Sequence, residues 1–309
     1  TLLSKNLEIP VHYLPAPIYI DSEKGNVAKN YIDNINFQQL SKKIRYKLNF
    51  KCYPVRFAAH KFEGLFDSST IKSTNFYKLI NETKNKSGKI FGAVFNPHDA
   101  RKNIEHMVRG FSMASSELKN SILILKLSTK GSEGEWNSIP GENKAPHKFI
   151  YNELFYRIIE THAVSFKNIY FISDFIPDED MAIFYKCFDY YLCTSRCEGQ
   201  NLPLKEAMMC GVVPISVDNT SMADYINEEN SFIINSYEEK VDFTNHDNAS
   251  FWGLDWSNSD IYQIADTLIN AAYADKKDLQ GKSNAAKNII KEYHSDKMIM
   301  NKIKTILNF

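Results

Sequence analysis

The chain has 309 residues, with 37 basic and 37 acidic side chains, so its formal net charge is zero. Hydrophobic residues make up 43% of the sequence, enough apolar material for a full core, which excludes a disordered, collagen-like or coiled-coil chain. The charge balance argues against a dedicated nucleic-acid-binding protein, but a small anionic ligand needs only a few local charges. No apolar run approaches the ~18 residues that span a bilayer, and residues 1–10 have no signal-peptide pattern.

The cysteines indicate free thiols and no metal centre. There are five of them, an odd number. Cys193 and Cys197 lie four positions apart, but no second pair of cysteine or histidine residues lies at zinc-finger spacing from them. We therefore expect a cytoplasmic protein, at most peripheral to a membrane, with no bound metal.

The N-terminal part differs from the rest of the chain. Residues 9–21 suggest a strand with a proline-rich exit, as in a linker, and residues 22–89 are polar and irregular. One amphipathic helix is expected over residues 37–48, with apolar residues on one face and several basic residues elsewhere. It either binds a membrane surface or an anionic partner, or packs on the core with its basic side in solvent; we favour the packed helix.

From residue 90 onward, short apolar runs alternate with helical periodicity. Strands are expected over residues 90–95, 122–127, 169–173, 188–195, 212–218 and 231–235. Helices are expected over residues 103–118, 147–163 and 201–211, in a short segment after Pro177, and from residue 260 to the end with a break near Gly281. Buried, β-branched strands that alternate with helices predict an α/β fold, a Rossmann-like parallel sheet with helices on both faces.

The most informative stretch is residues 194–211, TSRCEGQNLPLKEAMMCG, where a strand gives way to a helix. In an open parallel sheet, ligands bind beyond the carboxyl ends of the strands. A glycine-containing loop there exposes backbone N–H groups, and the following helix adds the positive end of its dipole, so the pair can bind phosphate. Glu198 in the loop and Glu206 on the helix are suited to accepting hydrogen bonds from sugar hydroxyls.

This stretch resembles the E-x7-E signature of retaining glycosyltransferases of the GT-B fold, the group 1 type, which use nucleotide-sugar donors. Three further stretches fall in the order that this family shows: FNPHDARKN at 95–103, residues 168–195, and GVVPISVDNTSMADYI at 211–226. Residues 9–17 resemble the end of the acceptor domain and the hinge. The resemblance implies that residues 90–309 are the donor-binding domain, that residues 1–21 are a hinge or remnant of the acceptor domain, and that residues 22–89 are an insertion.

The resemblance also implies roles for individual residues. Lys102, with Arg101 beside it, would neutralise the donor diphosphate and the leaving group. Glu206 would hold the ribose and Glu198 would contact the transferred sugar. Four consecutive residues would hold phosphate or sugar through backbone N–H groups: Gly199, Gln200, Asn201 and Leu202. The stretch Ile172–Phe175 would line the base, largely through backbone groups, and the family needs no metal ion and no further cofactor.

The sequence departs from the family at three positions. Asn96 stands where the family usually has an arginine that contacts the diphosphate. Asn201 replaces a glycine, although asparagine can still adopt positive φ. Residues 172–174 lack the usual glycine. Each site residue also has a plainer interpretation, Glu206 as a solvated helix residue for example, and His98, Trp252 and Trp256 are expected in loop or packing roles, with sugar stacking as the alternative for the tryptophans.

A complete GT-B enzyme has two Rossmann-like domains of similar size, and only about 90 residues precede the donor domain here. We expect either a fragment of a longer protein or a partner domain from another chain. The leading interpretation is a glycosyltransferase of polysaccharide biosynthesis, or its donor-binding part, that acts on a glycan or lipid-linked acceptor. The alternatives are a non-catalytic module that binds a nucleotide sugar or a partner, and a sugar-nucleotide epimerase or phosphorylase.

Overall fold

The computed structural model describes residues 47–54, 73–96, 99–128, 167–172, 174–241 and 253–307. The expected hinge at 9–21, most of the helix at 37–48, the helix at 147–163, His98 and Trp252 lie outside these residues. Within them the main sheet has eight strands in the order β2-β1-β5-β4-β3-β6-β7-β8. Their bounds are β1 Lys51–Pro54, β2 Thr74–Asn75, β3 Ile90–Phe95, β4 Ile122–Leu127, β5 Ile169–Ile172, β6 Tyr190–Cys193, β7 Val213–Ser216 and β8 Phe232–Ile233.

Six neighbouring strands of this sheet are all parallel, as the sequence pattern predicts: β5, β4, β3, β6, β7 and β8. Every residue of β3 and of β4 is buried, because helices cover both faces of the sheet at its centre. β3 is the first of the six in sequence and lies in the middle: β4 and β5 follow on one side, and β6 to β8 on the other. The strand order therefore reverses between β3 and β6, which is the place where Rossmann-like sheets bind ligands.

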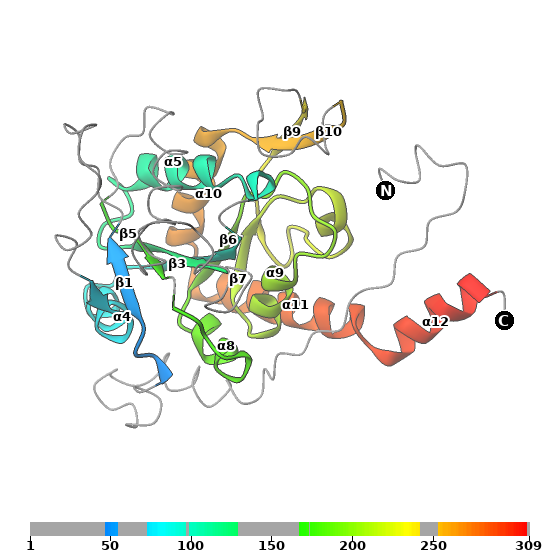
Figure 1. The fold of residues 1–309 in the computed structure, drawn as a ribbon, viewed down its shortest axis with the longest axis horizontal. Coiled ribbons are helices and arrows are strands. Elements are labelled where there is room, and N and C mark those ends of the chain that lie inside the picture. The colour runs from blue at the N-terminus through cyan, green and yellow to red at the C-terminus, as the bar shows by residue number, and fades with distance from the viewer. Residues whose placement is uncertain are drawn as a thin grey trace, which may run out of the picture.

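Helices cover the sheet in two layers (Figure 1). α5 (Ile104–Ala114) and α10 (Ile261–Tyr273) lie together on one face, while α8 (Asp178–Tyr185), α9 (Leu202–Met209) and α11 (Lys276–Tyr293) lie on the other. α5 and α10 approach closely at Gly110, where an added Cβ would lie 2.4 Å from Ile264. The three acidic residues of the first turn of α8 suit the positive end of that helix. None of these helices, nor any other in the described ranges, is long and apolar enough to cross a membrane.

Part of the N-terminal segment belongs to the same sheet and core. β1 pairs antiparallel with β5, β2 pairs antiparallel with β1, and α4 (Phe76–Asn85) follows directly. Leu48, Cys52 and Phe76 are fully buried in the main core. Lys47 forms an ion pair with Asp180 of α8. The described end of the predicted basic helix thus packs against the domain.

The break expected near Gly281 is wrong. α11 runs without interruption from Lys276 to Tyr293, and the C-terminal part breaks instead at Asp275 and near His294, before α12 (Asp296–Leu307). Asp275 caps α11 by accepting hydrogen bonds from Lys277 N and Asp278 N. A helical glycine costs only about 1 kcal/mol relative to alanine, which the eighteen-residue helix tolerates.

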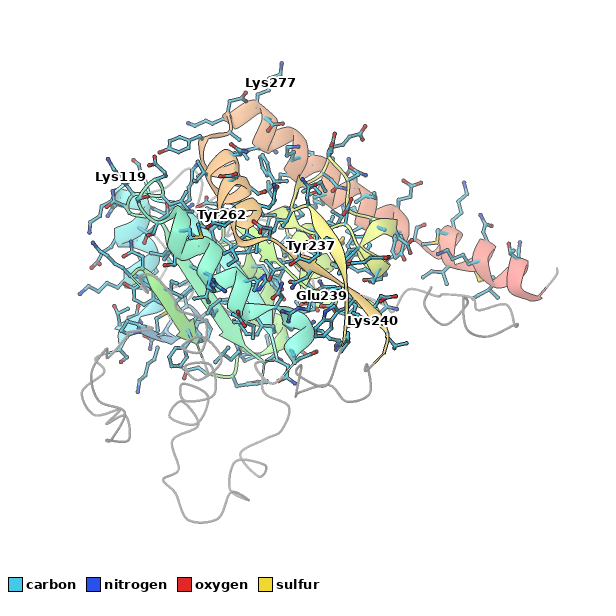
Figure 2. All side chains as sticks on the ribbon, turned by 90° about the horizontal axis from the view of Figure 1, so that it is seen from above. Lys119, Tyr237, Glu239, Lys240, Tyr262 and Lys277 are labelled. Carbon is cyan, nitrogen blue, oxygen red and sulfur yellow. The ribbon has the colours of Figure 1, made fainter. Side chains whose placement is uncertain are left out.

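A second, two-stranded sheet lies outside the main one. β9 (Ser236–Lys240) and β10 (Asp255–Ser259) pair antiparallel over their whole length. We call them the β9–β10 hairpin. It lies on the side of the molecule that carries α5 and α10 (Figures 1 and 2). Neither strand was expected from the sequence.

Candidate functional site

Two loops meet at the carboxyl edge of the sheet, on either side of the point where the strand order reverses. The loop after β3 contains the short helix η3 (Ala100–Lys102), and the loop after β6 leads into α9. These are the two stretches that the sequence marked as carrying the chemistry. Their meeting place follows from the strand order alone, because β3 and β6 are neighbours in the sheet.

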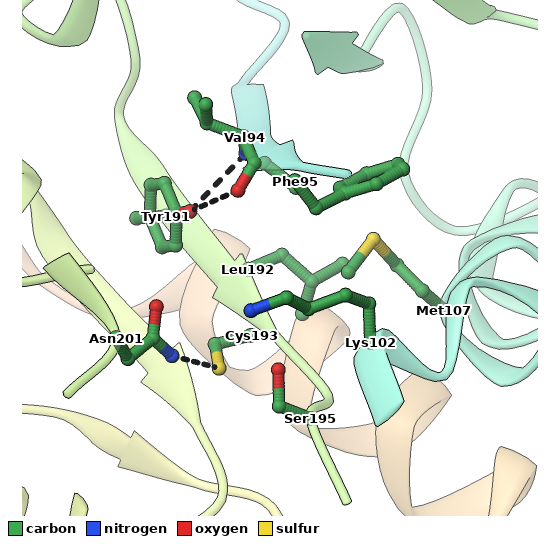
Figure 3. Close-up of a pocket in the computed structure, with 10 residues that line it drawn as sticks. Val94, Phe95, Lys102, Met107, Tyr191, Leu192, Cys193, Ser195 and Asn201 are labelled. Carbon is green, nitrogen blue, oxygen red and sulfur yellow. Dashed lines mark hydrogen bonds between the residues drawn. The ribbon is translucent and has the colours of Figure 1, made fainter. Parts of the chain in front are cut away.

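The two strands separate at this edge. They pair only at Phe91 with Tyr190 and at Gly92 with Tyr191. Beyond these pairs, the Tyr191 hydroxyl replaces the backbone hydrogen bonds between the two strands. Val94 N donates to this hydroxyl, and the hydroxyl donates to Val94 O, both at 3.1 Å (Figure 3). Burial raises the pKa of Tyr191 well above its ordinary value, and the nearby carboxylates of Glu198 and Glu206 add to the rise.

A small pocket opens between the separated strands, with a cavity volume of about 10 Å³, room for about one water. Figure 3 shows the Lys102 side chain reaching across this pocket toward β6. Its lining consists of Ala93, Val94, Phe95, Lys102, Met107, Tyr191, Leu192, Cys193, Ser195 and Asn201. A donor would therefore lie over the mouth of this pocket and not inside it.

The two predicted catalytic residues form an ion pair. Lys102 Nζ lies 2.5 Å from Glu198 Oε1, although the two residues are 96 positions apart. The side chains are only 15% and 5% exposed, respectively. The backbone N–H of Glu198 donates to Thr220 Oγ1 at 2.9 Å, which fixes the loop at that residue. The pair places an anion against the cation that lines the pocket.

Arg101 is held differently from its neighbour. Its guanidinium forms a two-point contact with Asp99, with Nε–Oδ1 at 2.9 Å and Nη2–Oδ2 at 2.5 Å. This hydrogen bonding raises the pKa of Arg101, and the charge of Glu198 acts in the same direction. Asp99 also caps η3 by accepting from Arg101 N. Arg101 is thus turned toward its own loop, whereas Lys102 points across to the other.

Glu206 lies one turn into α9 and faces α8. The Tyr185 hydroxyl donates to Glu206 Oε2 at 2.8 Å. Burial raises the pKa of Glu206, and the hydrogen bond from Tyr185 opposes that rise. Tyr185 is itself fully buried, so it orients this carboxylate rigidly. The sequence suggested Glu206 but gave no sign of Tyr185 as its partner.

Both helices that leave the site begin at an asparagine in the left-handed region. Asn103 has φ 51° before α5, and Asn201 has φ 47° before α9, which confirms that asparagine adopts positive φ there. Neither side chain caps its own helix: Asn103 donates to Asn258, and Asn201 donates to Cys193 Sγ at 3.1 Å. The Asn201 side chain therefore leaves the N–H groups of Leu202 and Leu204 to an anion, whereas Pro203 between them has no N–H.

The other predicted donor-binding residues are spread around this edge. Gly199 is exposed, with open space where a Cβ would lie, and Gln200 accepts a hydrogen bond from Lys205 at 3.2 Å. Leu202 begins α9 and Asn96 follows β3 directly. Ile172 is fully buried in the core, whereas Phe175 is 83% exposed, so of these two side chains that of Phe175 is open to a ligand. Contacts from the backbone of this stretch to a base stay a prediction.

The cysteines of the motif, Cys193, Cys197 and Cys210, are buried and form no disulfide bond. Burial raises the pKa of Cys193 and of Cys197. Across the described ranges no three histidine, cysteine, aspartate or glutamate side chains gather as metal ligands would. These cysteines therefore act as small buried residues.

The sequence did not single out the residues that join the two loops. Thr194 Oγ1 lies 3.2 Å from both Lys102 O and Asn103 O. Arg196 donates from its backbone N–H to Arg101 O and from Nη1 to Ala100 O, both at 2.7 Å. Both residues belong to the motif stretch, but their role depends on contacts with the loop after β3, which lies more than 90 positions earlier in the chain.

The comparisons with known proteins agree with this architecture. The family model described as "Glycosyl transferases group 1" matches residues 159–245, which include β5 to β9 and the loop that carries Glu198. This segment is similar to the group 1 glycosyltransferases. No curated protein matches the chain. The similarity in sequence is thus confined to this segment, which forms one half of the Rossmann-like sheet and the loop after β6.

Two solved structures illustrate the similarity. One is the N-terminal domain of a trehalose-6-phosphate phosphatase from Candida albicans: 14% identity, 94% of this chain and 49% of that one covered, TM-score 0.52. The other is the UDP-forming α,α-trehalose-phosphate synthase from Burkholderia xenovorans, in complex with glucose-6-phosphate. It has 14% identity and a TM-score of 0.50, and the match covers 74% of this chain and 46% of that one. At these identities the likeness concerns the fold alone, and the chain spans about half the length of these structures.

Proposed function

We propose that this chain is a retaining glycosyltransferase, or the donor-binding part of one, that transfers a sugar from a nucleotide-diphosphate sugar to a glycan or lipid-linked acceptor. The observation that carries the proposal is the Lys102–Glu198 pair at the point where the strand order reverses, beside the uncapped start of α9. The family match over residues 159–245 supports the same class of reaction.

In this proposal the donor diphosphate lies between Lys102 and the N-terminus of α9. When the bond between carbon 1 of the sugar and the diphosphate oxygen breaks, negative charge grows on the leaving phosphate. The Lys102 ammonium and the N–H groups of α9 stabilise that charge, as a metal ion does in other transferases. The acceptor hydroxyl attacks carbon 1 on the face from which the diphosphate leaves, and its proton passes to the departing phosphate.

The two glutamates have separate roles in the proposal. Glu198 contacts the transferred sugar, because it lies beside the diphosphate-binding lysine. Glu206 accepts hydrogen bonds from the ribose hydroxyls, in an orientation fixed by Tyr185. Binding of the acceptor needs a further domain, in the same protein or in a partner chain. The free cysteines support a cytoplasmic location.

The second candidate is a module that binds a nucleotide sugar without turnover. Two observations favour it: Asn96 stands where the family has an arginine, and Arg101 is already paired with Asp99. Fewer basic groups then remain to stabilise a leaving diphosphate.

The test is nucleotide binding followed by turnover. Thermal shifts with UDP, GDP, ADP and their sugars identify the ligand, and donor hydrolysis measures activity. We expect the wild type to bind one of these nucleotides, and Lys102→Ala and Glu206→Ala to bind it at least tenfold more weakly. The matched control is Lys84→Ala: Lys84 pairs with Asp189 at 2.5 Å, but near the amino ends of the strands.

Each outcome has a clear meaning. No shift with any nucleotide would refute the donor site. Binding without turnover, in the presence of a range of sugar acceptors, would favour the module. Equal losses in Lys84→Ala and Lys102→Ala would show that the lysine effect is one of stability.

A further inference from the structure

The β9–β10 hairpin contacts both loops of the candidate site, although it is not part of the main sheet. On the side of the first loop, Asn103 Nδ2 donates to Asn258 Oδ1 at 3.0 Å. On the side of the second loop, Ser257 N donates to Arg196 O at 3.0 Å. The segment that the sequence left unassigned is therefore bonded to both halves of the site.

Arg196 is the residue through which these contacts converge. Its backbone N–H and its Nη1 donate to two consecutive carbonyls of η3, those of Arg101 and Ala100. Its guanidinium carbon lies 4.6 Å from the centroid of the Trp256 ring. The arginine thus fixes the backbone directly before Lys102 and lies two residues before Glu198 in its own loop.

The hairpin in turn is held by one carboxylate. Glu239 Oε2 accepts from Trp256 Nε1 at 3.1 Å and from Asn258 Nδ2 at 2.8 Å (Glu239 is labelled in Figure 2). Trp256 is 3% exposed and Asn258 is 4% exposed, so neither is a surface contact. Glu239 therefore fixes both the ring that stacks on Arg196 and the amide that binds Asn103.

We propose that Arg196, supported by Trp256 and the β9–β10 hairpin, is a positioning residue that sets the separation between Lys102 and Glu198. The inference rests on the proposed function, because it assigns the pair to a donor. Arg196 itself touches no reacting atom. Its two carbonyl contacts lie before Lys102, and its own loop carries Glu198, so a shift of Arg196 moves the two partners relative to each other.

The experiment compares nucleoside diphosphate with nucleoside monophosphate in the full chain, by isothermal titration with the base that the wild type binds. Lys102 serves the diphosphate, so misplacing it weakens binding of the diphosphate far more than of the monophosphate. For Arg196→Ala we expect about a tenfold loss of diphosphate affinity and little change for the monophosphate. Millimolar methylguanidinium should restore the diphosphate affinity of Arg196→Ala, but not that of Lys102→Ala.

A second series keeps the test decisive if Arg196→Ala does not fold. Trp256→Phe keeps a stacked ring but loses the bond to Glu239, whereas Trp256→Leu loses both; we expect a larger selective loss in Trp256→Leu. The matched control is Arg109→Ala, which removes an arginine of α5 that pairs with Glu105 and should leave both affinities unchanged.

The possible failures are distinguishable. Unchanged diphosphate affinity, or an equal loss for both nucleotides without rescue by methylguanidinium, would overturn the positioning role and leave the donor site standing. Absence of diphosphate binding by the wild type would overturn the proposed function, and this inference with it.

Discussion

Replacing Glu198 by glutamine is expected to tighten the binding of a free nucleoside diphosphate. The charge of Lys102 is already neutralised by Glu198 at 2.5 Å. A diphosphate must share that lysine with the carboxylate, and it is repelled by the carboxylate as well. Glutamine keeps the shape of the side chain and can accept a hydrogen bond from Lys102, but it carries no charge.

The size of the effect follows from the burial of the pair. Exposed ion pairs contribute about 0–1 kcal/mol, and breaking a fully buried pair costs about 3–5 kcal/mol. With side chains 15% and 5% exposed, the Lys102–Glu198 pair lies between these limits, nearer the buried one. Because the diphosphate shares Lys102 with Glu198 and does not break the pair completely, only part of this energy, about 1–2 kcal/mol, opposes binding. Without it, the affinity for the diphosphate rises about 5- to 30-fold. Turnover of a nucleotide sugar should fall, because Glu198 contacts the sugar in the proposal.

The assay is isothermal titration of the nucleoside diphosphate at low and at physiological salt. The gain should shrink as salt rises, because the effect is electrostatic. Glu105→Gln is the control: it also removes one carboxylate, that of the 3.5 Å pair with Arg109, and should leave the affinity unchanged. A Glu198→Gln variant that binds the diphosphate no better than the wild type would refute the reasoning, because the carboxylate would then not compete for Lys102.

Three further predictions concern the carboxylate of α9 and two core positions. Burial raises the pKa of Glu206, so the charged form of this side chain destabilises the folded state. Glu206→Gln should therefore gain thermal stability relative to the wild type as pH rises from 4 to 8. In a binding titration the same variant should lose the preference for ribonucleotides over 2′,3′-dideoxynucleotides. Burial lowers the pKa of Lys126 to about 8, so the wild type should become more stable as pH rises from about 8 to 10.5. Lys126→Met should have a higher melting temperature than the wild type at pH 7, and this difference should shrink toward pH 10.5. A Cβ at Gly92 would lie 2.2 Å from the Phe188 ring, so Gly92→Ala should cost about 1–3 kcal/mol in urea unfolding, and Phe188→Leu should partly restore it.

The central strands were predictable because both of their faces are buried. Such strands consist of continuous apolar runs, as in residues 122–127, and the helices between them show their periodicity clearly. β1 and β2 were not predictable. They have four and two residues, and β1 joins the main sheet through β5, far away in the chain, so neither composition nor periodicity marks them.

The site, like the fold, could be predicted from the sequence only in part. Lys102 and Glu198 were expected at one edge of the sheet, and the structure places them in contact. Tyr185 and Arg196 could not be anticipated, because each acts through a hydrogen bond to a distant segment that no local pattern encodes. The error at Gly281 has a similar origin: helix continuation there depends on packing and on the cap at Asp275, not on one residue's propensity.

The β9–β10 hairpin also affects the order in which the protein can form its site during synthesis. Asn103 and Asn258 are 155 positions apart, so their contact is among the most non-local in the described chain. Chains fold broadly from the N-terminus as they leave the ribosome, and contacts that close long loops form late. The loop after β3 emerges early, but its partner in β10 emerges only after the rest of the motif. The geometry of the site is therefore completed after most of the sheet that carries it.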